Sequence, residues 1–109
     1  MLLLAFLPLL AAFEDFSLAE STQVHCTPGE EIVLSVPFAG HGDEPWELQV
    51  PSPLVELLDQ SLVPNHSRSG LWGEQEFRLR CSSTAPSNSA VTLHLVRASG
   101  SLPVILSIL

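Results

Sequence analysis

The stretch GEEIVLSVPF, residues 29–38, decides the fold class of this chain. Its apolar side chains Ile32, Leu34, Val36 and Phe38 recur at every second position, directly after a Thr-Pro-Gly turn. Successive side chains of a β-strand point to opposite faces, so a period of two indicates a strand with one buried face. The same alternation returns in five further runs, at residues 22–26, 46–50, 77–81, 91–95 and 104–108.

The segments between these runs are rich in residues that form turns. Nine prolines and six glycines are spread along the chain and leave little room for a long helix. Residues 53–62 could form a short helix, and they could equally form a short strand with a flanking loop. The spacing of the runs predicts an all-β fold, an immunoglobulin-like antiparallel β-sandwich of about seven strands. We place this single domain at residues 20–109.

The N-terminal run MLLLAFLPLLAAF, residues 1–13, carries no charge. It is shorter than the roughly 20 residues that span a bilayer as a helix, and it fits the apolar core of a signal peptide. We predict a signal peptide over residues 1–19, with small residues at Ser17 and Ala19 for the peptidase. The chain would then be secreted into an extracellular, periplasmic or endomembrane compartment, with no stable membrane insertion after cleavage. An N-terminal helix or strand of the folded domain, or a membrane anchor, is the open alternative, because no basic residue precedes the run.

The charge of the chain excludes several classes of partner. It has four arginines, no lysine and twelve acidic residues, a net charge of −8. Removal of residues 1–19 takes away Glu14 and Asp15 and leaves four arginines against ten acids, or −6. This excludes a basic nucleic-acid footprint and a polybasic membrane patch. We expect a soluble monomer that binds no nucleic acid.

Two cysteines, Cys26 and Cys81, lie outside the predicted signal peptide. In a small secreted domain they are expected to form one disulfide, and two buried free thiols are the alternative. Cys26 would end the first strand and Cys81 a strand antiparallel to the second, so a bridge requires the strand ends to bend together. Asn65 begins the glycosylation sequon Asn-His-Ser, which could also be a chance match in a polar loop.

The sequence does not favour catalysis, a metal or a cofactor. No Gly-x-Ser-x-Gly nucleophile motif is present, and a disulfide would remove any cysteine nucleophile. The acidic pairs Glu30-Glu31 and Asp43-Glu44 are adjacent in sequence, so on a strand their side chains would point to opposite faces. The histidines are dispersed, at positions 25, 41, 66 and 94. We therefore expect no enzyme, no cofactor and no metal site.

Binding through loops is better supported. The stretch 37–46 and the stretch 69–74 carry residues that a simple turn does not need, and the second places Trp72 between two glycines. Loops at one end of a rigid sandwich are common recognition elements, and large apolar side chains on them are anchor candidates. The alternative for Trp72 is that it folds back and caps the small core.

Three motifs occur in an order that resembles the chagasin family of cysteine-peptidase inhibitors. GEEIVLSVP leads into FAGHGDEPW, a Gly-Leu-Trp-Gly stretch precedes EQEF, and AVTLHLV runs into Arg-Ala-Ser. The resemblance implies an immunoglobulin-like sandwich with three neighbouring loops at one end. In that family these loops enter and block the active-site cleft of papain-like cysteine peptidases without being cleaved.

The resemblance also implies which residues would contact a peptidase. His41 and Gly42 stand where the family carries two threonines, Asp43 stands for its closing glycine, and Trp72 replaces a glycine. The third motif keeps Arg97 and lacks the following Pro-Trp. We predict a secreted, reversible inhibitor of papain-like peptidases; the alternative is a secreted immunoglobulin-like protein-binding module without peptidase inhibition. The predicted contact residues are His41, Gly42, Asp43, Gly70, Leu71, Trp72, Gly73, Arg97, Ala98 and Ser99.

Overall fold

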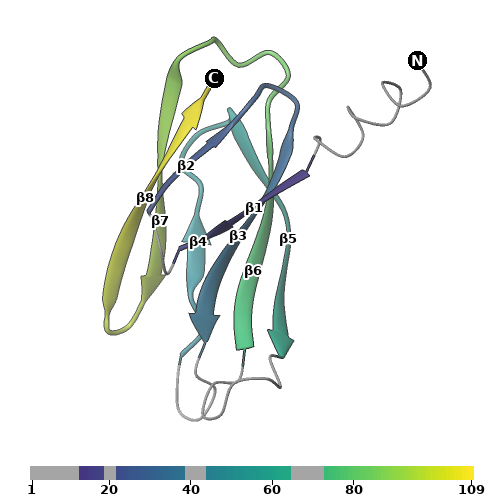
Figure 1. The fold of residues 1–109 in the computed structure, drawn as a ribbon. Coiled ribbons are helices and arrows are strands. Elements are labelled where there is room, and N and C mark those ends of the chain that lie inside the picture. Colours follow the sequence, from purple (N-terminus) through teal and green to yellow (C-terminus); the bar gives the residue numbers. More distant parts are fainter. Residues whose placement is uncertain (1–12, 19–21, 39–43, 65–72) are drawn as a thin grey trace, which may run out of the picture.

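The structure, a computed structural model, describes residues 13–18, 22–38, 44–64 and 73–109. Within these ranges every regular element is a strand, and the strands form two sheets that face each other (Figure 1). In chain order they are β1 (Phe13–Ser17), β2 (Gln23–Cys26), β3 (Glu31–Phe38), β4 (Glu47–Gln49), β5 (Val55–Pro64), β6 (Gly73–Cys81), β7 (Ser89–Arg97) and β8 (Gly100–Ile108). The described part of the chain holds no helix that could span a membrane.

The two sheets have four strands each. One has the order β1-β3-β6-β5 and the other the order β2-β8-β7-β4. This confirms the all-β immunoglobulin-like sandwich, with eight strands described where about seven were predicted. The central pairings are antiparallel, as predicted, but β1 pairs with β3 and β2 with β8 in parallel. The chain alternates between the two sheets over its first three strands, because β1 and β3 lie in one sheet and β2 in the other.

The alternating apolar residues meet between the sheets. Inward apolar side chains of β3, β6, β7 and β8 are buried in one hydrophobic cluster. A slip of one residue would move a strand's apolar side chains to its other face, so burial of one face fixes the register. Full burial of one such side chain stabilises the fold by about 1.5–3 kcal/mol. The completely buried side chains are Ile32, Leu34, Phe77, Leu79, Leu93, Leu95, Val104, Leu106 and Ile108 together with both cysteines.

A disulfide joins Cys26 at the end of β2 to Cys81 at the end of β6, with 6.7 Å between the two Cα atoms. The turn after Cys26 brings these strand ends together. Gly29 adopts a φ of 83°, which few other residues tolerate, and its amide donates to the carbonyl oxygen of Cys81 at 2.8 Å. The predicted bridge is therefore confirmed.

The structure decides the element type that was left open at residues 53–62, and it corrects the predicted start of the last strand. Residues 53–62 do not form a helix, because Val55–Pro64 is the edge strand β5. Residues 100–103 were interpreted as part of a break, yet they begin β8 and pair with β7. Pro103 is tolerated there because β2 pairs with β8 only from Ile105 onward, so β8 has one neighbour at this point.

Candidate functional site

The ends of β3, β5 and β7 and the starts of β4, β6 and β8 lie at one end of the sandwich, here called the loop pole (Figure 1). In the chain these strand ends are joined by the β3–β4 loop (residues 39–46), the β5–β6 loop (residues 65–72) and the β7–β8 turn at Ala98 and Ser99. The ends of the first two loops are adjacent on one sheet, since Gly73 pairs with Phe38 on one side and with Pro64 on the other. The fold therefore places Gly73, Arg97, Ala98 and Ser99 at one pole, together with the strand ends Phe38 and Pro64 that precede the other predicted contact residues.

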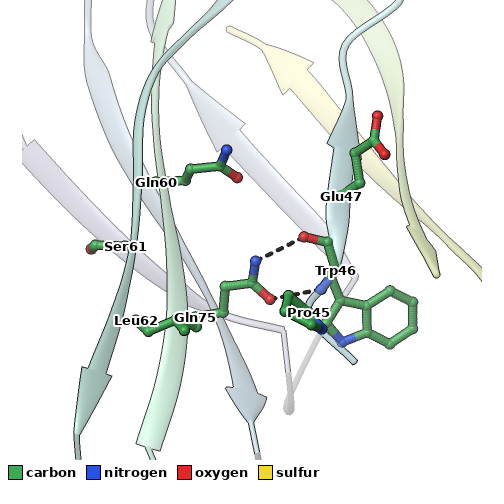
Figure 2. Close-up of a pocket in the computed structure, with 7 residues that line it drawn as sticks. All are labelled: Pro45, Trp46, Glu47, Gln60, Ser61, Leu62 and Gln75. Carbon is green, nitrogen blue, oxygen red and sulfur yellow. Dashed lines mark hydrogen bonds between the residues drawn. The ribbon is translucent and has the colours of Figure 1, made fainter. Parts of the chain in front are cut away.

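Gln75 of β6 hydrogen-bonds the C-terminal end of the β3–β4 loop to the β1-β3-β6-β5 sheet. Its side-chain amide donates to the carbonyl oxygen of Trp46 at 2.8 Å, and its oxygen accepts from the amide of Trp46 at 2.9 Å (Figure 2). Gln75 is 5% exposed, so both of its polar atoms need partners inside the protein. The pair of bonds resembles one rung of a β-ladder and holds Trp46 at a fixed distance from β6.

The same end of the loop also contacts the β2-β8-β7-β4 sheet. The guanidinium of Arg97, at the end of β7, lies 4.0 Å from the centroid of the Trp46 ring, and its Nη1 donates to the carbonyl oxygen of Glu44 at 3.4 Å. The amide of Ala98 donates to Oε1 of Glu44 at 2.5 Å. Arg97 and Ala98 are therefore joined to residues 44–46, the described part of the β3–β4 loop.

The predicted contact residues divide into three groups in the structure. Gly73 is buried as the first residue of β6, and Arg97 turns toward Trp46, so both support the loops. Ala98 and Ser99 are exposed at the tip of the turn. The remaining predicted residues, His41, Gly42, Asp43, Gly70, Leu71 and Trp72, lie outside the described residues, as does the sequon at Asn65.

The sequence did not single out Gln75, and it placed Glu44 and Trp46 in the stretch 37–46 without indicating the contacts that they make. Gln75 did carry a signal, because it is a polar residue at an inward position of β6, in register with Phe77 and Leu79. A polar residue in that series is buried only when it is hydrogen-bonded. Glu44 carried no such signal, since its partner is a backbone amide more than 50 residues away in the chain.

A hollow of about 690 Å³ opens beside the loop pole, between β4 and β5 (Figure 2). Pro45, Trp46 and Glu47 line one side and Gln75 lies at its base. The opposite side is β5, where Leu62 is 42% exposed although its strand position faces the other sheet. β4 has only three residues and leaves this end of β5 uncovered. No group of three or more metal-ligating side chains occurs among the described residues.

Comparison with known proteins supplies structural neighbours. No family model and no curated protein matches the sequence. The crystal structure of the cysteine protease inhibitor EhICP2 from Entamoeba histolytica superposes with a TM-score of 0.62, at 12% identity, over 89% of this chain and 95% of that one. The chain shares the fold of a cysteine protease inhibitor. The solution structure of amebosin superposes with a TM-score of 0.54, at 12% identity, over 88% of this chain and 95% of that one.

Proposed function

We propose that this protein is a secreted, reversible inhibitor of papain-like cysteine peptidases that blocks the active-site cleft with its loop pole. The proposal rests on the contacts that hold Trp46 against both sheets. Gln75 hydrogen-bonds its backbone, and the guanidinium of Arg97 lies over its ring. A loop held in one conformation before binding loses less conformational entropy on association than a free loop does. The shared fold with EhICP2 supports the same function.

In this proposal inhibition needs no covalent chemistry. His41, Gly42 and Asp43 would lie nearest the catalytic cysteine and histidine of the peptidase and exclude the substrate sterically. Residues 70–73 and residues 97–99 would contact the two walls of the cleft. Because Arg97 is engaged with Trp46, the β7–β8 turn would contribute mainly through the exposed tip at Ala98 and Ser99.

The buried disulfide is consistent with an oxidising compartment and supports the proposal of secretion. The partner would be one papain-like peptidase per inhibitor monomer, with no cofactor and no metal. In a glycosylating source, Asn65 would carry the glycan.

A titration of papain with the purified protein tests the proposal, with a small peptide substrate as the reporter. We expect competitive, reversible inhibition, and an unchanged intact mass of the inhibitor after long incubation. A trypsin-type serine peptidase in the same assay is the control and should stay fully active. Full papain activity at high micromolar inhibitor would contradict the proposal.

The second candidate is a secreted immunoglobulin-like module that binds a protein other than a peptidase. It is favoured by Leu62, which lines the hollow on β5 and is 42% exposed, an apolar contact outside the three loop segments. It predicts that Trp72→Ala abolishes binding to a non-peptidase partner while papain activity is unaffected by either form of the protein.

A further inference from the structure

The segment Phe13–Ser17 is a strand of the sandwich, although it lies within the predicted signal peptide. As β1 it pairs in parallel with β3 over five positions, from Phe13 opposite Glu31 to Ser17 opposite Ser35. It therefore covers the edge of β3 that β6 does not occupy.

The residues that follow extend this attachment into the core. Leu18 is 6% exposed and belongs to the main hydrophobic cluster, and its amide donates to the carbonyl oxygen of Ser35 at 2.7 Å. The ring of Phe16 packs edge-on against the ring of His25 on β2, with 5.1 Å between the centroids. The segment thus contacts both sheets and closes one side of the sandwich.

Cleavage after Ala19 would remove all of these contacts. β3 would lose its neighbour along residues 31–35, and the core would lose Leu18. An exposed strand edge of this length is a template for pairing with other chains. β3 also ends at Phe38, where the β3–β4 loop begins, so a loosened β3 would disturb the loop pole.

We propose that residues 13–18 remain in the mature domain, and that any signal peptidase hydrolyses a peptide bond N-terminal to Phe13. In this hydrolysis the C–N bond breaks, the oxygen of water bonds to the carbonyl carbon to give a carboxylate, and a proton of water goes to the nitrogen to give the new amine. Residues 1–12 still hold an apolar run within the roughly 7–15 residues of a signal-peptide core. The mature domain would then keep Glu14 and Asp15 and carry a net charge of −8 in place of −6, whether or not it inhibits a peptidase.

The N-terminus of the secreted protein tests this proposal directly. The full chain is expressed in a secretory host, and the protein is characterised by intact mass and N-terminal sequencing. We expect a first residue at Phe13 or earlier, and an uncleaved chain that begins at Met1 also keeps the strand. A folded, secreted protein that begins at Glu14 or any later residue would overturn the proposal.

A second measurement asks whether the segment stabilises the fold. In the full chain, Leu18→Ala should lower the midpoint of thermal unfolding by about 10 °C, because it leaves a cavity in a small core. Leu18→Met, which keeps the side-chain volume, should stay within about 3 °C. Leu109→Ala is the matched control, since Leu109 is 55% exposed and should shift the midpoint by less than about 2 °C. Equal midpoints for Leu18→Ala and Leu109→Ala would refute the structural role.

Discussion

Gln75 ties Trp46 to β6 because it provides a donor and an acceptor at one buried position. Its amide satisfies both backbone groups of Trp46, a residue that otherwise stands between a loop and a three-residue strand. Backbone groups at such a boundary lack regular strand partners and need others. A single side chain thus replaces the pairing that the short β4 cannot provide.

Replacement of Gln75 by leucine should therefore lower the free energy of unfolding more than the same replacement at an exposed glutamine does. The substitution leaves the amide and carbonyl of Trp46 without these partners, so we expect a loss of about 1–3 kcal/mol in the free energy of unfolding. Urea denaturation measures it. Gln49→Leu, at an exposed position of β4, is the matched control and should change the free energy by less than about 0.5 kcal/mol. Similar values for the two variants would show that the Gln75 bonds do not stabilise the fold.

Arg97 and Trp46 form the second fastening, and their contact has an optical readout. In a Trp72→Phe background Trp46 is the remaining tryptophan, and Arg97→Gln should shift its fluorescence emission to longer wavelength as the ring becomes more hydrated. Loss of the cation–π contact should cost about 0.5–1 kcal/mol. Arg80→Gln is the control, because Arg80 forms an exposed ion pair with Glu31 at 2.7 Å, far from Trp46. An unchanged emission in Arg97→Gln would contradict the contact.

At the scale of elements, the alternation of apolar residues predicts where the strands lie, but it does not predict where each strand begins and ends. The runs around Ile32, Phe77 and Leu93 were predictable because a period of two and burial of one face reinforce each other. The start of β8 was missed because Gly100, Ser101 and Pro103 are turn formers by local preference. Antiparallel pairing with β7 overrides that preference, and such pairing is a long-range property that a local pattern does not contain.

The disulfide links the ends of two strands, β2 and β6, and it was predicted correctly from the sequence. It closes a separation of 55 residues and should stabilise the fold by about 4 kcal/mol in the chain-entropy model. We expect the double variant Cys26→Ala, Cys81→Ala to lose a comparable free energy of unfolding in urea. Thiol titration of the denatured wild-type protein should detect no free thiol before reduction and two afterwards. Two free thiols without reduction would contradict the bridge.

At the scale of the whole molecule, the two poles of the sandwich are built differently. The loop pole carries the β3–β4 loop, the β5–β6 loop and the β7–β8 turn, whereas the opposite pole carries the disulfide and the β6–β7 connection (Figure 1). The order of motifs in the sequence predicted that the turn at Ala98 and Ser99 and the strand ends Phe38, Pro64 and Gly73 lie at the first pole, while residues 39–43 and 65–72 lie outside the described residues. The contacts between them depend on Gln75 and Glu44, whose partners lie 29 and 54 residues away in the chain.

The central claim, inhibition of a papain-like peptidase through the loop pole, is tested most directly by the inhibition constant for papain in one matched pair of variants. Ala98→Arg places a bulky charge on the exposed tip of the β7–β8 turn, and Ser87→Arg places the same charge at the exposed opposite pole. We predict competitive inhibition by the wild-type protein, at least a tenfold weaker constant for Ala98→Arg, about 1.4 kcal/mol, and no change for Ser87→Arg. No inhibition by the wild-type protein, or equal weakening by the two substitutions, would contradict the account.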